Sequence, residues 1–188
     1  MTEVQLTSFE HILLGLICLA PSSGYDLKRI FATSPMGIYQ PSSGALYPAL
    51  RRLERKGLLR AGAARGADRH ARARYVYEPT ELGVLAHTSW LRAPVRPDTV
   101  ARDLGLHLMR FVMMEHLLPP DQVLNFLRDL ADALAAFTAE LDRHAAATDP
   151  SGGHARLALD HGLAVHRASL QWTENTIAAL ATSPPLSA

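Results

Sequence analysis

Apolar positions recur along most of the chain at intervals of three and four residues, the spacing that places side chains on one side of a helix. In the first part of the chain this pattern predicts helices over residues 8–20, capped by the serine that opens it, and 25–32. A third helix is predicted from a cap at Ser42 or Ser43 to a glycine stop at Gly57, with leucines on its buried side. Three short helices in this order are typical of a helix-turn-helix protein.

Two strand-like stretches, at 58–60 and 75–78, follow the third helix. The segment between them, 61–74, is rich in Gly, Ala and Arg and has no bulky apolar residue, so we expect an exposed turn. Together they predict a two-stranded β wing with a basic tip directly behind the third helix. Thr80 is then expected to cap a fourth helix that ends near residue 91. The periodic apolar positions of this fourth helix are Leu82, Leu85, Ala86 and Trp90.

The stretch 93–97, with two prolines in five residues, is the predicted linker between two domains. Residues 1–92 are interpreted as a winged-helix domain and 98–188 as a helical dimerisation domain, so the predicted fold class is mainly α. One helix is predicted over 98–118. The next carries an apolar seam at heptad spacing, and the last, 154–182, is apolar on two sides, so both are expected to contact a second chain. The residues assigned to that contact are Val123, Leu127, Leu130, Leu134, Phe137, Leu163 and Leu170.

The 188-residue chain has a net charge of only +1, but its charges are unevenly placed. Nine Lys and Arg residues lie between Arg51 and Arg74, against two acids, Glu54 and Asp68. We call these nine residues the basic cluster. A local excess of cations indicates one anion-binding surface rather than a generally basic protein.

The third helix has the features of a DNA-reading helix. Small residues open it, and its arginines fall opposite its leucines at 100° per residue. Arginine forms two hydrogen bonds with guanine in the major groove, and we expect Arg51 or Arg52 to do so. The wing would bring further cations to the phosphates. The residues predicted to contact double-stranded DNA are Ser42, Ser43, Gly44, Tyr47, Arg51, Arg52, Arg55, Arg65, Arg69, His70, Arg72 and Arg74.

Other classes of function find little support in the sequence. The single cysteine, Cys18, gives no disulfide framework, and the histidines lack the spacing of a metal-ligand set, so no metal or cofactor is expected. There is no nucleophile elbow, no phosphate-binding glycine loop and no pair of carboxylates in an apolar frame, so an enzyme is not expected. The apolar run at 11–20 is too short to span a bilayer, and we expect a cytoplasmic protein with no membrane partner.

Two stretches, SSGALYPALRRLERKGLL (42–59) and YVYEPTELG (75–83), resemble the PadR family of winged-helix transcriptional regulators. The first is similar to the family's Ser-x-Gly-x-Leu-Tyr-Pro-x-Leu-x-x-Leu-x-x-x-Gly-Leu signature, and the second to its wing strand and Thr-x-x-Gly. HILLGLI (11–17) and GYDL (24–27) fit the first two helices. WLRAP (90–94) and HGLAVHRASLQW (161–172) resemble the branch with the longer C-terminal domain.

The resemblance implies a homodimer that binds an inverted repeat, usually as a repressor, with possible release by a small-molecule effector. It also implies that Ser43, Gly44 and Tyr47 contact the DNA backbone or base edges, and that the wing arginines contact phosphates. The wing of this chain departs from the family pattern, because it is rich in Ala and Arg rather than mixed in charge.

Alternatives remain open at several positions. Tyr47 either donates its hydroxyl to a phosphate or seals the edge of the helix as a half-buried ring. Trp90 and Trp172 either line an effector pocket or belong to the core, where a tryptophan at helical spacing more often lies. The rival function is a helical small-molecule receptor or protein-interaction module that keeps the winged-helix shape without reading DNA.

Overall fold

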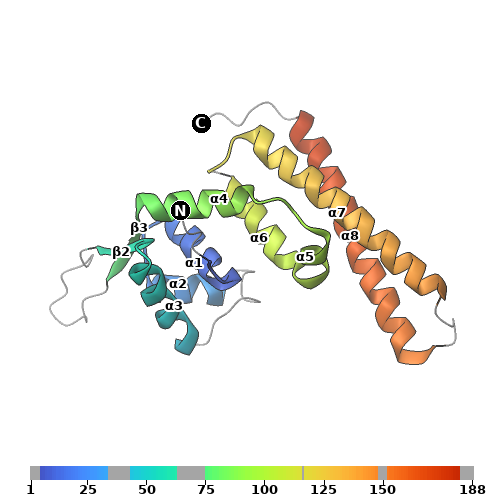
Figure 1. Cartoon of the computed structure of the whole chain (residues 1–188), viewed down its shortest axis with the longest axis horizontal. Helices are drawn as coiled ribbons and strands as arrows, with labels where there is room; N and C mark the ends of the chain where they lie inside the picture. Colours follow the sequence, from blue (N-terminus) through green and yellow to red (C-terminus); the bar gives the residue numbers. More distant parts are fainter. Residues whose placement is uncertain (1–4, 34–42, 63–74, 116, 148–151, 183–188) are drawn as a thin grey trace. The chain divides into compact units, whose positions relative to one another are not determined.

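The chain folds into two compact units, Met1–Leu91 and Arg92–Ala188, and each is described by itself (Figure 1). The computed structural model describes residues 5–33, 43–62, 75–115, 117–147 and 152–182. The mainly α fold class is confirmed. The predicted domain limits remain a prediction, and the predicted linker falls at the start of the second unit.

The first unit contains four helices among its described residues, and their buried side chains form one core. The helices are α1 (Ser8–Leu19), α2 (Gly24–Thr33), α3 (Ser43–Arg55) and α4 (Glu81–Arg92). Apolar residues from α1, α2 and α3, such as Leu13, Leu27 and Leu50, are fully buried. Thr7 rather than the predicted Ser8 caps α1, because Thr7 and Glu10 bond each other's backbone N–H groups in a capping box.

The sheet has one strand more than the sequence predicts. Strands β1 (Ser22–Ser23), β2 (Leu59–Gly62) and β3 (Val76–Pro79) form an antiparallel sheet in the order β1-β3-β2. In the register, Leu59 pairs with Pro79 and Ser22 with Tyr77. The predicted β2–β3 pair is confirmed, and β1 is an additional strand that the sequence did not predict. Two serines show no alternation of apolar residues, yet their backbone groups complete the other edge of β3.

Helix α4 begins in direct contact with the chain that leaves α3. Thr80 Oγ1 donates to Gly57 O at 2.6 Å and accepts from Gly83 N at 3.0 Å, which confirms the predicted cap. The Thr80 backbone N–H also donates to Leu58 O at 3.0 Å. A Cβ at Gly83 would lie only 2.1 Å from Leu58 O. This close approach explains why the Thr-x-x-Gly sequence requires its glycine.

The buried side of α4 differs from the predicted one. Gly83, His87 and Leu91 are the buried residues of α4, whereas Leu82 and Leu85 are exposed. The close approach of Gly83 to Leu58 sets this rotation, and residues at intervals of four from Gly83 follow it inward. The apolar periodicity predicted the wrong buried side of α4, because the glycine at position 83 does not count as an apolar position.

Helices α1 and α3 are joined by a buried carboxylate. The Glu10 side chain is 2% exposed, and its Oε1 accepts a hydrogen bond from Arg52 Nε at 2.6 Å. Lys56 Nζ lies 3.6 Å from Oε2. Burial alone would raise the pKa of Glu10, but the Arg52 hydrogen bond, the Thr7 N–H and the charges of Lys56 and Arg52 together lower it. Glu10 is therefore charged at neutral pH.

The second unit has a shorter first helix than expected. Its helices are α5 (Pro97–Arg102), α6 (Leu104–Met114), α7 (Pro120–Ala147) and α8 (Gly153–Thr182). The single helix expected over 98–118 is interrupted at Asp103, whose backbone (φ −154°, ψ 69°) is not helical. The Asp103 carboxylate accepts the Leu106 N–H at 3.0 Å, so it caps a new helix where the apolar pattern alone showed one continuous run.

The heptad seam of α7 packs inside a single chain. Helices α7 and α8 lie side by side as a hairpin (Figure 1). Leu127, Leu130 and Leu134 are 0% exposed there, and Leu163 of α8 is buried with them. Their assignment to a contact between chains was therefore wrong, because a helical hairpin buries heptad positions just as a coiled coil between chains does. The assignment of Val123, Phe137 and Leu170, which are only half-buried, remains untested.

We expect Gly83→Ala to destabilise the first unit by about 3 kcal/mol, because the new methyl group would overlap the Leu58 carbonyl and neither backbone can move freely. Gly162→Ala is the matched control, since a Cβ at that position of α8 meets nothing within 4 Å. It should instead stabilise the chain by about 0.5–1 kcal/mol. Denaturant unfolding of the two variants measures both effects, and equal stability would contradict the close approach.

Arg52→Ala should lower the free energy of unfolding by about 2 kcal/mol, because it leaves the buried Glu10 carboxylate without its nearest partner. Since the folded-state pKa of Glu10 is lowered, this stabilisation is present above the unfolded pKa and is lost as the pH falls through the folded one. The difference from the unmodified chain should therefore shrink in acid. Arg55→Ala, at an exposed position, should change stability by less than about 0.5 kcal/mol at either pH.

Candidate nucleic-acid interface

Helix α3 presents one buried and one cationic side, as its sequence predicts. Leu46, Leu50 and Leu53 are buried, while Tyr47, Arg51 and Arg55 are exposed. The helix runs on through Pro48. The predicted DNA contacts on this helix begin with Ser43, its first residue, and the exposed Gly44.

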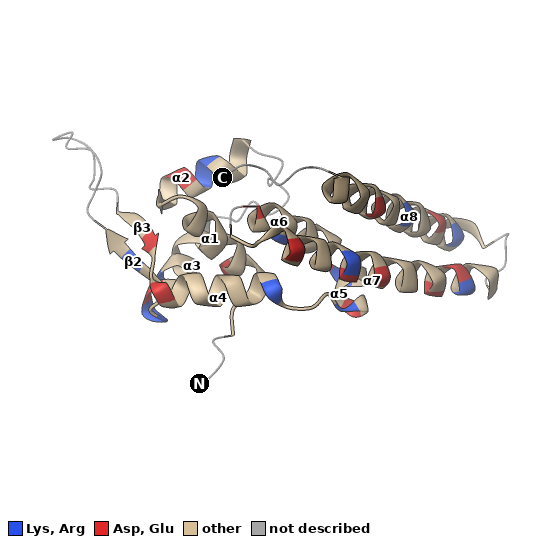
Figure 2. Cartoon of the chain, turned by 90° about the horizontal axis from the view of Figure 1, so that it is seen from above, with Lys and Arg blue, Asp and Glu red and all other residues tan. Residues whose placement is uncertain are grey.

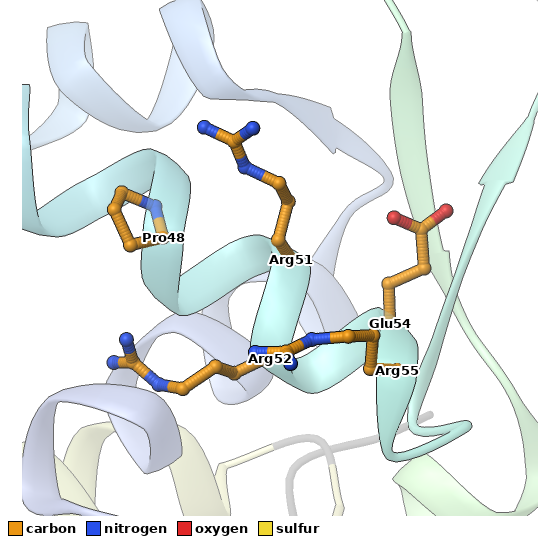
Figure 3. A pocket seen from close by; sticks show the side chains of 5 residues that line it. All are labelled: Pro48, Arg51, Arg52, Glu54 and Arg55. Atoms are coloured by element: carbon orange, nitrogen blue, oxygen red, sulfur yellow. The ribbon is translucent and has the colours of Figure 1, made fainter.

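The structure divides the basic cluster into paired and unpaired cations. Arg52 and Lys56 are bound to Glu10, and Arg60 forms an ion pair with Glu78 at 2.9 Å across β2 and β3. Within the part of the chain that the structure describes, Arg51 and Arg55 form no ion pair. The sequence had placed Arg51 and Arg52 on the same open face. Figure 3 instead shows them leaving α3 in different directions.

An open hollow of about 350 Å³ lies along this side of α3. Its lining residues are Pro48, Arg51, Arg52, Glu54 and Arg55 (Figure 3). All of them come from one helix, so the hollow is the space between long side chains rather than an enclosed binding cavity. Three guanidinium groups and one carboxylate line it, which suits a polyanion lying across the helix better than a small apolar ligand.

The ring of Tyr47 packs against Gly24, which has no side chain in its way. Its side chain is 44% exposed, and a Cβ built at Gly24 would lie 2.6 Å from its Cε1 atom. The edge of the ring thus packs against the start of α2, while nearly half of the side chain remains open to solvent. Gly24 is a residue that the sequence analysis did not assign to the site. The adjoining glycine and tyrosine of GYDL were its only visible signal.

Tyr77 of strand β3 is affected by charges on α3. Burial raises the pKa of Tyr77, and the charge of Glu54 raises it further while that of Arg51 opposes the shift. These effects require Arg51 and Glu54 to lie near Tyr77. The electrostatics thus link Arg51, but not Arg55, to strand β3. Tyr75, just before this strand, is also exposed.

The remaining predicted wing contacts fall outside the described residues. They are Arg65, Arg69, His70, Arg72 and Arg74, and Ser42 before α3 lies outside as well. Their assignment to DNA binding stays a prediction.

In the view of Figure 2, acidic and basic residues are interspersed along α7 and α8.

The two tryptophans belong to different units, and each has ring partners within its own. Trp90 stacks on His11 with 4.5 Å between ring centroids and lies 5.6 Å from His87. Trp172 meets the edge of Phe111 at 5.7 Å. These contacts account for both residues as packing elements, and their role in an effector pocket stays a prediction.

The buried titratable groups that the structure describes outside this surface show no reactive arrangement. Burial lowers the pKa of His87 and of His107 to about 4, with the charge of Arg110 also acting on His107, so both are neutral at physiological pH. Burial raises the pKa of the Cys18 thiol to about 11, which keeps it protonated.

Among the described residues, no group of three His, Cys, Asp or Glu side chains could hold a metal ion. Nor is any described helix both long and apolar enough to cross a membrane.

Part of the chain matches a known protein family. Residues 13–88 match the family model described as the transcriptional regulator PadR-like family. No curated protein sequence matches the chain.

Several solved structures are similar to most of the chain. Bacillus subtilis PadR in complex with operator DNA is 20% identical, with 93% of this chain and 99% of that chain covered and a TM-score of 0.44. The same protein in complex with p-coumaric acid is 21% identical, with 93% and 99% covered and a TM-score of 0.42. The Vibrio cholerae virulence activator AphA is 23% identical, with 92% and 97% covered and a TM-score of 0.41. Through residues 13–88, which include most of α1 and α4 and the described parts of α2, α3 and the sheet, the chain carries a domain of the transcriptional regulator PadR-like family.

Proposed function

We propose that the chain is a sequence-specific DNA-binding transcriptional regulator that acts as a homodimer on an inverted repeat, most simply as a repressor. The observation that carries the proposal is the pair Arg51 and Arg55 on α3. Both are exposed and lack an acidic partner among the described residues, and Arg51 lies near β3. Cations that no protein carboxylate neutralises are available to phosphates and to guanine edges.

The two arginines have different roles in this proposal. Arg51 lies one turn after Tyr47, which packs against Gly24, and the charges of both residues act on Tyr77 of β3. We therefore assign Arg51 to base reading and Arg55, near the end of the helix, to a phosphate. Arg52 is bound to Glu10 and is no longer assigned to base reading.

A homodimer is supported by the outer side of α8. Only Leu163 and Thr173 are fully buried in this 30-residue helix. Leu157, Val165 and Trp172 are exposed and fall within about 80° of one another at 100° per residue. The exposed His161 and Ala168 lie between them on the same side of the helix. A mainly apolar exposed stripe of this kind marks an interaction surface. We assign it to the second copy, in place of the buried seam of α7.

A small-molecule effector is the remaining part of the proposal. Bacillus subtilis PadR has been solved in complex with p-coumaric acid, which concerns that protein. For this chain, release by a small ligand is proposed without a ligand class or a site. The rival function, a helical receptor or protein-interaction module that does not read DNA, would leave Arg51 and Arg55 without a partner.

We expect Arg51→Ala to cost about 1–3 kcal/mol of affinity for a site selected from a random DNA pool, and to relax preference at one base pair. Arg55→Ala should weaken binding to all sequences alike and reduce the slope of log K against log salt by about 1. Arg143→Ala is the matched control, because Arg143 is an exposed arginine of α7 without a described ion pair. The rival function would be favoured if the unmodified chain failed to select DNA, or if its DNA affinity did not change with salt concentration.

Introducing two carboxylates on the α8 stripe, through Leu157→Glu and Val165→Glu together, should weaken the dimer by roughly 100-fold, because each charge would lose its water on association. Sedimentation equilibrium measures the dissociation constant, and circular dichroism checks that the helices persist. Ala178→Glu, at an exposed position off the stripe, should leave the dimer unchanged. A double variant that stays fully dimeric would remove the stripe from the interface.

A further inference from the structure

Glu10 engages more donors than a helix cap requires. Its Oε2 accepts the Thr7 backbone N–H at 3.0 Å, which completes the capping box. Its Oε1 accepts Arg52 Nε at 2.6 Å, and Lys56 Nζ approaches Oε2 at 3.6 Å. Lys56 also donates to the Gln5 carbonyl at 2.8 Å, so the chain just before α1 holds it as well. One buried carboxylate thus holds two cations of the basic cluster.

We infer that Glu10 is a specificity-determining residue, which holds Arg52 and Lys56 against α1 and so keeps two cations of α3 away from DNA phosphates. This inference rests on the proposed DNA-binding function. It predicts that the chain binds random DNA less tightly than its count of basic residues would allow. Specific contacts through Arg51 then account for a larger share of the total affinity.

The burial of Glu10 explains why DNA would not simply capture these two cations. The Glu10 side chain is 2% exposed, so moving Arg52 to a phosphate would leave a carboxylate in the protein interior with fewer partners. An exposed pair such as Arg60 with Glu78 has no such restraint, because water can solvate either partner. Burial of the acid therefore makes the pairing of Arg52 persistent.

Arg52 and Lys56 would nevertheless be available if the charge of Glu10 were removed. Their side chains are 42% and 33% exposed, and Arg52 lines the hollow of α3 together with Arg51 and Arg55. Rotation about their side-chain bonds would then bring both cations toward a polyanion on α3. Each further phosphate contact steepens the salt dependence of binding by about 0.9. The change in the slope of log K against log salt when the charge of Glu10 is removed therefore measures how many cations Glu10 keeps from phosphates.

The test uses the full chain and a random-sequence duplex, with binding measured over a series of salt concentrations. Glu10→Gln keeps the shape of the side chain and removes its charge. It should steepen the slope by about 1–2 and tighten random-DNA binding several-fold at low salt, so that the ratio of specific to non-specific affinity falls. Adding Lys56→Gln to Glu10→Gln should reverse about half of the change. Glu81→Gln, an equal charge change at an exposed position of α4, should leave the slope unaltered.

Lys56→Gln alone provides a second measurement that does not depend on how well the Glu10 variant folds. If Lys56 is already withheld, its loss should not change the salt slope, whereas Arg55→Ala should reduce it. A slope that stays unchanged in folded Glu10→Gln, or that falls by about 1 in Lys56→Gln, would overturn the inference while leaving the proposed function intact. Absence of salt-dependent binding by the unmodified chain would instead count against the proposed function.

Discussion

The ion pair between Glu10 and Arg52 is the contact on which the arrangement of the first unit depends. Leucine packing between α1 and α3 is strong but not directional, so by itself it tolerates small rotations of α3. Arg52 and Lys56 are one turn apart, and both reach the same carboxylate. Two directed contacts from one side of a helix fix its rotation. Arg51 and Arg55, each one residue earlier and about 100° around the helix, are thereby set on a different side.

Two glycines then place the other parts of the site around that fixed helix. Gly83 lets α4 start against the Leu58 carbonyl, which also accepts the Thr80 N–H, so β3 and α4 follow closely on the end of α3. Gly24 lets Tyr47 lie against the start of α2. In both places a methyl group would meet atoms at less than 3.0 Å. The site therefore depends on the absence of two side chains as much as on the presence of its arginines.

The elements with strong periodicity could be predicted from the sequence, whereas the partners of charged residues could not. The leucines of α3, the Thr80 cap and the β2–β3 pair follow from local spacing and turn chemistry. Arg51 and Arg52 look alike to any local rule, because the carboxylate that distinguishes them lies 42 residues earlier in the chain. Strand β1 has only two residues, both serines, and carries no pattern at all.

The heptad seam shows a different limit, since its pattern was recognised but its partner was not. Leu127, Leu130 and Leu134 must pack against a second helix. The helix α8 of the same chain can take that place as well as a helix of another copy. Once the seam packs within the chain, the apolar stripe of α8 still remains exposed. A two-fold contact through that stripe would use the same residues on both copies and relate two α3 helices by one axis. The same symmetry relates the halves of an inverted repeat, so the dimer and the operator geometry form a single hypothesis rather than two.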